Sequence, residues 1–395
     1  MRILLLGTGM QGRTALHDLA ASAGVTRVVA ADRDVEALRD CVRGGGYGAK
    51  VECRRLDAAE PAQLDRLMAE GFDVAIDLLP SAFIAPVAAA AIRYGVHLVN
   101  TMYVTPELEQ LAAEAKARSV TILPEFGMDP GLDLVLLGEA VRGFEEVTDI
   151  LSYGAGIPEP RAADNLLKYK VSWTLEGVLR AYRRSAQLIR NGVVVEVGAT
   201  EQFLPEHVHE VAVEGVGALE AYPNGDAVHV VRLLGLPVER LRRAGRYTMR
   251  YPGHCAFWRA LVALHLLDDD PVVVDGVSVD RKRFLAAVLE PQLRYGDDER
   301  DLAIIRLEVE GTRAGARERV VYQVIDRRDL GTGLTAMSRL VGYTASIGAQ
   351  MIAAGAIARR GLLSPVTDVP CEPLVRALAE RGITVTRVVT TRPSV

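Results

Sequence analysis

The chain has 395 residues, of which 49% are hydrophobic and 25% are charged, the composition of an ordinary globular protein. Its 46 basic and 51 acidic residues leave a formal net charge of −5, which gives no electrostatic reason to expect a nucleic acid partner. The length exceeds what one compact core usually holds and predicts two domains.

The chain shows no signal for a membrane, an oxidising compartment or a metal. The opening MRILLLGTG has too short an apolar run for a signal peptide or membrane anchor. The four cysteines lack C-x-x-C spacing, which indicates reduced thiols and no structural zinc. His207 and His209 form H-x-H, but two imidazoles without a third ligand do not predict a metal site. We therefore expect a cytoplasmic protein that binds neither membrane nor metal.

Residues 1–130 alternate short apolar runs with amphipathic stretches. The apolar runs predict strands at 2–7, 27–32, 72–80, 97–101 and 119–126. The amphipathic stretches predict helices at 12–22, 35–43, 58–70, 83–95 and 106–119. Apolar strands joined by helical crossovers are typical of a parallel sheet that is covered on both faces. The sequence therefore predicts an α/β fold whose first domain, 1–130, is doubly wound.

Residues 131–340 follow a different pattern, in which several strands succeed one another. We expect strands at 147–158, 192–197, 209–217, 227–236, 246–253, 302–311 and 318–327. Helices are expected at 174–192, 255–270 and 280–293, and again at 342–361 and 372–382. This indicates a mixed α+β second domain at 131–340, followed by a C-terminal segment, 341–395, that packs back on the first domain.

A nucleotide-binding motif follows the first predicted strand. Residues 7–12 read G-x-G-x-x-G and open a helix, so the glycines permit a tight turn and a close approach of the backbone to a pyrophosphate. Asp32 ends the second strand, where an acid would hold the ribose hydroxyls. A carboxylate there would repel a 2′-phosphate and favours NAD, whereas Arg33 keeps NADP as an alternative. The predicted cofactor-binding residues here are Gly7, Gly9, Met10, Gln11, Gly12, Asp32, Arg33, Asp57, Leu79 and Pro80.

Several motifs, in the same order, resemble the saccharopine dehydrogenase family, including its lysine 6-dehydrogenase relatives. They are EFGMDPGLD at 125–133, LSYGAGIPEP at 151–160, LLKYKVSWTLEGVL at 166–179, AYPNGDA at 221–227, TMRYPGH at 248–254, YGDDERD at 295–301 and VGYTASIGAQMIAAGAI at 341–357. The resemblance implies a Rossmann domain and a second domain that contributes substrate contacts and dimerisation. It also implies oxidation of a carbon–nitrogen bond at the lysine ε-carbon, with hydride passing to nicotinamide and the imine being hydrolysed.

The resemblance further implies roles for individual residues. Substrate contacts would come from Met102, Tyr103, Asn224, Gly225, Thr248 and Arg250. Additional cofactor contacts would come from Met128, Asp129, Pro130 and Thr174. At Gly225 this chain departs from the reductases, which have a substrate-binding arginine in the corresponding loop. A smaller substrate than saccharopine would not need that arginine.

The chemistry requires a proton acceptor, because a lysine-like amine has an ordinary pKa near 10.4. Asp129 is the first candidate, with a simple turn carboxylate as the alternative. His254 is the second, and a buried structural histidine is at least as plausible. Tyr103 would orient either group or else serve packing. Arg250 is the expected carboxylate clamp, since guanidinium matches a carboxylate with two parallel hydrogen bonds, and a surface ion pair is the alternative.

The sequence thus predicts an NAD(P)-dependent dehydrogenase that acts on a small lysine-derived amino acid as a homodimer. Two alternatives stay open. One is an L-lysine 6-dehydrogenase that releases ammonia, and the other is a non-catalytic NAD-binding regulator. The Pro223-Asn224-Gly225 stretch is also typical of a hairpin turn, because Asn-Gly tolerates positive φ.

Overall fold

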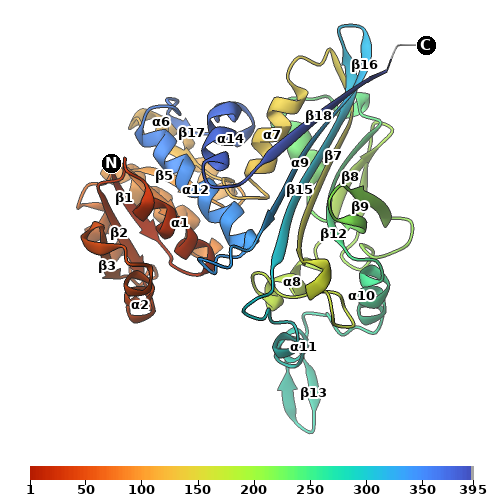
Figure 1. Ribbon diagram of the computed structural model, residues 1–395, viewed down its shortest axis with the longest axis horizontal. Coiled ribbons are helices and arrows are strands. Elements are labelled where there is room, and N and C mark those ends of the chain that lie inside the picture. The colour runs from red at the N-terminus through yellow and green to blue at the C-terminus, as the bar shows by residue number, and fades with distance from the viewer. Residues whose placement is uncertain (393–395) are drawn as a thin grey trace. The chain divides into compact units, whose positions relative to one another are not determined.

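The computed structural model describes residues 1–392 and divides into two compact units (Figure 1). The first unit comprises residues 1–139 and 338–384, and the second comprises 140–337 and the segment that begins at 385. The segment 341–395, which we expected to pack on the first domain, is therefore divided. Residues 341–384 belong to the first unit, and the segment that begins at 385 belongs to the second.

The first unit is built on a seven-stranded parallel sheet in the order β17-β6-β5-β4-β1-β2-β3. The strands are β1 (Arg2–Leu6), β2 (Arg27–Asp32), β3 (Val51–Arg55), β4 (Val74–Asp77), β5 (His97–Asn100), β6 (Thr121–Leu123) and β17 (Gly361–Leu362). Strand order reverses between β1 and β4, and ligands of such sheets bind outside the strand ends at this point.

Helices connect these strands. They are α1 (Met10–Ala21), α2 (Val35–Gly45), α3 (Pro61–Met68), α4 (Ile84–Tyr94), α5 (Pro106–Gln110), α6 (Ala112–Ala117), α7 (Leu132–Val141), α12 (Ala336–Ala353), α13 (Pro365–Asp368) and α14 (Cys371–Ala379). Residues Ile3 to Leu6 and Val28 to Ala31 are fully buried, as expected for strands covered on both faces. The predicted doubly wound fold is confirmed, although β3 was missed because VECRR has few apolar residues.

The second unit is built on a nine-stranded mixed sheet in the order β10-β11-β12-β7-β15-β16-β18, with β8 and β9 attached to β12. Its strands are β7 (Glu146–Pro158), β8 (Ala186–Arg190), β9 (Val193–Val197), β10 (His209–Val213), β11 (Gly217–Pro223), β12 (Arg243–Arg250), β15 (Asp301–Arg313), β16 (Ala316–Arg327) and β18 (Val385–Arg392). The long strands β7, β15, β16 and β18 lie side by side (Figure 1). The predicted mixed second domain is confirmed.

The remaining elements of the second unit are four helices and a separate small hairpin. The helices are α8 (Leu175–Ala181), α9 (Ala227–Leu233), α10 (His254–Ala263) and α11 (Arg281–Leu289), and the hairpin is β13 (Val272–Val274) with β14 (Val277–Val279). Both units also contain single-turn 3-10 helices. The first unit has η1 (Gly48–Lys50) and η2 (Ser81–Phe83), and the second has η3 (Pro160–Ala162), η4 (Val238–Arg240) and η5 (Glu290–Gln292).

Two predicted elements of the second unit were wrong, and one strand was missed. Residues 227–236, expected as a strand, form α9, because the side chain of Asp226 caps the helix by accepting from the His229 N–H. The long helix expected at 174–192 ends at Ala181, and its second half becomes β8 because it pairs with β9 and β12. Short apolar runs cannot be assigned by periodicity alone. The C-terminal strand β18 was not expected at all.

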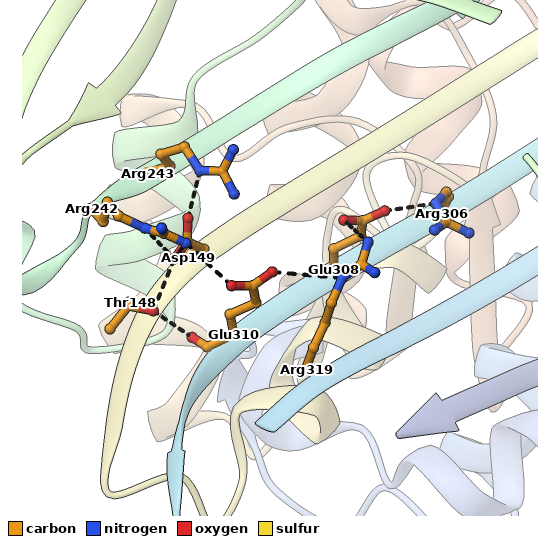
Figure 2. Close-up of polar contacts among 8 residues, drawn as sticks. All are labelled: Thr148, Asp149, Arg242, Arg243, Arg306, Glu308, Glu310 and Arg319. Atoms are coloured by element: carbon orange, nitrogen blue, oxygen red, sulfur yellow. Dashed lines mark hydrogen bonds and ion pairs between the residues drawn. The ribbon is translucent and has the colours of Figure 1, made fainter. Parts of the chain in front are cut away.

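One face of the second sheet carries a network of charged side chains (Figure 2). Asp149 is 1% exposed and accepts hydrogen bonds from Arg242, Arg243 and the Thr148 hydroxyl. Glu308 on β15 similarly bridges Arg306 on the same strand and Arg319 on β16. Burial by itself raises the pKa of Asp149, but the hydrogen bonds from the arginines outweigh it and hold the pKa below its ordinary value.

We predict that Asp149→Asn lowers the free energy of unfolding by about 2 kcal/mol at pH 7. The expected loss of stability is smaller than for a fully buried ion pair. Arg242 and Arg243 are 46% and 50% exposed, so water can hydrate them when the carboxylate is removed. The pKa of Asp149 is lower in the folded protein than in the unfolded chain, where it is near 3.8. The contribution of Asp149 to the free energy of unfolding is therefore complete above the unfolded pKa, and it disappears as the pH falls through the folded-state pKa.

Urea unfolding of the wild type and the variant at pH 7 and in acid measures this difference. Asp40→Asn is the control, because its ion pair with Arg43 is exposed and should contribute little. An equal loss for both variants at pH 7 would contradict the prediction.

Candidate active site

The glycine loop after β1 has the geometry of a pyrophosphate cradle. Gly7 has φ +87°, and an added Cβ would lie 2.8 Å from the Leu78 carbonyl oxygen. A Cβ on Gly12 would lie 2.1 Å from the Gly7 oxygen, so a side chain would separate α1 from the loop. Gly9, the N-cap of α1, has nothing within 4 Å of a Cβ position. The first and third glycines thus shape the turn, while the second leaves space at the positive end of the helix.

Asp32 fixes this loop from the end of β2. Its Oδ2 accepts from the Thr8 N–H at 2.7 Å and the Thr8 hydroxyl at 2.9 Å, and its Oδ1 accepts from the Asp34 N–H at 3.0 Å. Burial raises the pKa of Asp32, but these hydrogen bonds outweigh it and lower the pKa overall. Asp32 is therefore a carboxylate at neutral pH, at the position where a ribose hydroxyl donor would be held.

Two exposed arginines lie next to Asp32. Arg33 follows it in the chain, and Arg55 is its register partner on β3. Sequence reasoning missed Arg55 because it missed the strand that places it. Asp57, also predicted as a cofactor contact, accepts from the Ala59 N–H at 3.0 Å in the turn before α3. The end of the sheet next to Asp32 therefore combines one carboxylate with two cations.

A buried chain of hydrogen bonds shapes the ends of β4 and β5. Asp77 accepts from the Leu79 N–H at 3.0 Å and from the Asn100 amide at 2.7 Å, and the Asn100 oxygen accepts from the Met102 N–H at 2.6 Å. Burial raises the pKa of Asp77 to about 7. Met102 and Tyr103 are 37% and 42% exposed at this edge, and Pro80 is exposed as well. The predicted contact residues are thus held by a polar framework that lies beneath them.

The segment from Met128 to Pro130 lies in a tight loop before α7. The Gly127 N–H donates to the Pro130 oxygen at 2.9 Å, and Asp133 accepts from the Gly131 N–H at 2.8 Å. Met128 and Pro130 are buried, whereas Asp129 is exposed. The loop therefore leaves the Asp129 side chain exposed between two buried neighbours.

In the second unit, Arg250 at the end of β12 is the central feature. It is 6% exposed, its Nη1 donates to the Met249 oxygen at 2.8 Å, and its guanidinium lies 5.0 Å from the centre of the Tyr169 ring. No carboxylate within residues 1–392 forms an ion pair with it. Glu220 is its register partner on β11, but that carboxylate accepts from the N–H groups of Gly253 and Cys255 at the start of α10.

Several buried polar atoms have no partner. Within residues 1–392 they include Arg250 Nε, Ser172 Oγ, His254 Nδ1 and Trp258 Nε1, together with the hydroxyls of Tyr169 and Tyr295. The Tyr169 ring packs on the guanidinium. The positive charge of Arg250 also acts to lower the pKa of Tyr295, against the larger opposite effect of burial. A buried positive charge without an anion is costly, and unsatisfied donors add to that cost. A bound carboxylate would satisfy the charge and the donors together.

His254 and Asn224 also belong to this cluster. The His254 Nε2 lies 2.7 Å from the Tyr182 hydroxyl, and burial followed by the charge of Arg250 lowers the pKa of His254 well below its ordinary value. A histidine of such low pKa is neutral and a weak base. The Asn224 amide donates to the Thr248 hydroxyl at 2.6 Å. The structure thus brings together Arg250, Thr248, Asn224 and His254, as expected from the sequence.

Gly225 has the positive φ that the sequence predicted, whereas Thr174 has a structural role that it did not predict. Gly225 has φ +108° in a turn that leads from β11 into α9, so the predicted hairpin at Pro223-Asn224-Gly225 was wrong. The Thr174 hydroxyl, predicted as a cofactor contact, accepts from the Gly177 N–H and caps α8. Sequence reasoning gave no role to Tyr182, which lies outside the quoted motifs, or to Tyr295, which opens the motif YGDDERD.

Within residues 1–392 no group of three or more histidine, cysteine, aspartate or glutamate side chains is arranged to hold a metal ion. No helix in the same range is long and apolar enough to cross a membrane.

The chain matches two family models of known proteins. Residues 3–123 match the family model of the saccharopine dehydrogenase NADP binding domain, and residues 127–383 match that of the saccharopine dehydrogenase C-terminal domain. Among the relatives is the saccharopine dehydrogenase [NADP(+), L-glutamate-forming] of Pyricularia oryzae, 28% identical over 96% of this chain and 96% of its own. The Saccharomyces cerevisiae protein of the same name is 27% identical over 96% and 97%.

A longer relative and a solved structure extend the comparison. The mitochondrial alpha-aminoadipic semialdehyde synthase of Bos taurus is 26% identical over 97% of this chain but only 47% of its own. The apo saccharopine dehydrogenase (L-Glu forming) structure from Saccharomyces cerevisiae superposes with a TM-score of 0.87 at 25% identity, covering 98% of this chain and 99% of that one. The predicted family is confirmed, and the chain belongs to the saccharopine dehydrogenase family.

Proposed function

We propose that this protein is an NADP-dependent dehydrogenase that oxidises the secondary amine of saccharopine and forms L-glutamate and an aldehyde. A carbon–nitrogen bond becomes an imine as hydride leaves the carbon, and water then cleaves the imine into an amine and an aldehyde. The bound nicotinamide would supply the hydride acceptor. The names of the fungal relatives support this reaction, and the fold and its glycine loop support the cofactor class.

The observation that carries the proposal is the unpaired buried charge of Arg250. A substrate with an α-carboxylate would neutralise the guanidinium and accept from the free Nε. Glu220 cannot do so because it holds the start of α10. Arg250 therefore binds and orients the substrate, which is the contribution that a carboxylate clamp makes to catalysis.

NADP is proposed ahead of NAD, although Asp32 favoured NAD in the sequence. Asp32 would hold a ribose hydroxyl, while the exposed side chains of Arg33 and Arg55 supply the positive charge that a 2′-phosphate needs. The Gly9 position is open to the pyrophosphate. The relatives that are named NADP(+)-dependent support the same choice.

Lysine is the second candidate substrate, and Gly225 is the reason to test it. With φ +108°, this position is strained for any other residue, so an arginine is not simply restored there. The single α-carboxylate of lysine would match the guanidinium of Arg250. Asp129 stays the proposed proton acceptor, with Tyr103 beside the reacting amine. A homodimer in the cytoplasm also stays a prediction.

The direct test follows nicotinamide reduction with saccharopine, lysine and no amino acid, each with NADP and NAD. The proposal expects turnover with saccharopine and NADP. Turnover with lysine alone would establish the alternative substrate. Nucleotide binding without turnover of either compound would favour the non-catalytic regulator.

We predict that Arg250→Met lowers kcat/KM for saccharopine by about 100-fold, because charged hydrogen bonds to the carboxylate are lost. The same change should leave the free energy of unfolding equal or higher, since it removes an uncompensated buried charge. Arg306→Met is the control, because it breaks a buried ion pair with Glu308 and should destabilise the fold. Activity and urea unfolding measure both effects, and a destabilised Arg250→Met protein would show that the arginine is structural.

We also predict that the double variant Arg33→Ala/Arg55→Ala raises the KM for NADP at least 10-fold and leaves the KM for NAD unchanged. Arg39→Ala is the matched control, since Arg39 is an exposed arginine on α2 that already pairs with Glu36. Steady-state kinetics with both nucleotides measure the change. Equal effects on the two KM values would refute the assigned phosphate contacts.

A further inference from the structure

Asp77 and Asn100 face each other at the ends of the neighbouring strands β4 and β5. They are register partners, and both side chains are buried. The Asn100 Nδ2 donates to Asp77 Oδ2 at 2.7 Å, and Asp77 Oδ1 accepts from the Leu79 N–H at 3.0 Å. The Asn100 Oδ1 accepts from the Met102 N–H at 2.6 Å. Two buried side chains therefore fix the backbone that follows each strand.

The segment that follows β5 is bonded in turn to the loop that precedes α7. The Phe126 N–H donates to the Asn100 carbonyl oxygen, and the Glu125 N–H donates to the Met102 carbonyl oxygen, each at 2.9 Å. The same loop continues to Asp129, the proposed proton acceptor. Both backbone groups of Met102 are thus used, its N–H by a side chain and its oxygen by this loop.

The other end of the pair reaches the glycine loop. A Cβ added to Gly7 would lie 2.8 Å from the Leu78 oxygen and 3.2 Å from the Leu79 nitrogen. The backbone of the glycine loop therefore lies directly against the N–H group that donates to Asp77. Asp77 and Asn100 thus stand between the proposed pyrophosphate cradle and the two segments that form the edge of the proposed site.

We propose that Asp77 and Asn100 are positioning residues that hold Tyr103 and Asp129 in one arrangement relative to the glycine loop. The inference rests on the proposed function, because it assigns a task to the framework beneath the proposed site. Both side chains are buried, so they act through the backbone that they bind.

The polarity of the hydrogen bonds requires these two residue types in this order. A carboxylate only accepts, so Asp77 suits the two N–H donors that point at it. The amide of Asn100 has donors at one end and an acceptor at the other, so it donates to Asp77 and accepts from Met102. Turning the amide over would set oxygen against carboxylate and N–H against N–H. The pair therefore has one satisfied orientation.

Tyr103 and Asp129 depend on this framework because they have little side-chain burial of their own. Tyr103 is 42% exposed, and Asp129 is exposed in its loop. Their side chains therefore take their positions from the backbone beneath them. A displacement of about 1 Å between reacting groups can lower a rate about 100-fold, so a small change in that backbone affects catalysis.

Exchanging the two residue types provides the test. In Asp77→Asn two amide groups meet, so one bond is lost, and in Asn100→Asp two carboxylates repel each other. The double variant Asp77→Asn/Asn100→Asp restores every bond. The amide then accepts from the Leu79 N–H and donates towards position 100, and the carboxylate there accepts from the Met102 N–H.

Steady-state kinetics with saccharopine and NADP measure the effect at about pH 9, well above the pKa of about 7 to which burial raises Asp77. Each single variant should lower kcat about 10-fold or more and change the KM for saccharopine less than about 3-fold. The double variant should recover kcat to within about 3-fold of the wild type. Unchanged kcat in the single variants, or a loss of kcat that persists in the double variant, would overturn the proposal.

Asp18 provides the matched control. It is another buried carboxylate of the first unit, and it accepts from Ser346, Gln350 and Arg381. Asp18→Asn should lower the free energy of unfolding about as much as Asp77→Asn does, but leave kcat unchanged. An equal fall in kcat for Asp18→Asn would mean that loss of stability, rather than positioning, explains the effect.

Hydrogen–deuterium exchange separates this inference from the proposed function, because it needs no substrate. Peptides that cover 100–104 and 125–131 should exchange about 5-fold faster or more in each single variant, and at the wild-type rate in the double variant and in Asp18→Asn. Wild-type exchange in the single variants would overturn the positioning role whatever the substrate is. A wild type that shows this exchange pattern but does not turn over saccharopine would refute the proposed function alone.

Discussion

A buried positive charge without a partner is the constraint on which the second unit depends. Arg250 is 6% exposed at the end of β12, and the acid opposite it on β11 is used to hold a helix start. Burial of an uncompensated ion costs several kcal/mol, so such an arrangement persists where a ligand supplies the missing charge. The surrounding tyrosines screen the guanidinium from water but offer no anion of their own.

The first unit is organised by backbone geometry instead of charge. Gly7 and Gly12 shape the turn after β1, and Gly9 leaves the start of α1 open. Asp32 holds this loop through Thr8, and Asp77 holds the neighbouring strand ends through Asn100. The first unit thus carries the proposed nucleotide cradle, and the second carries the proposed site for the substrate carboxylate.

The sequence predicted the features that depend on local pattern. Glycines at fixed spacing, an acid at the end of the second strand and continuous apolar strands each follow from short-range rules, and the family motifs added Arg250 and Asn224. Features that depend on distant pairing were missed. Arg55 is placed by an edge strand with few apolar residues, and Tyr182 and His254 meet across 72 positions of the chain. The stretch 227–236 was misread because the decisive signal was a single capping aspartate.

The central claim is that a substrate carboxylate neutralises Arg250, and ligand-induced stabilisation tests it most directly. Saccharopine at about 100 times its dissociation constant should raise the free energy of unfolding of the wild type by about 2.7 kcal/mol. Arg250→Met should show no such increase at the same saccharopine concentration, although its own stability is equal or higher. An equal stabilisation of both proteins by saccharopine would contradict the account.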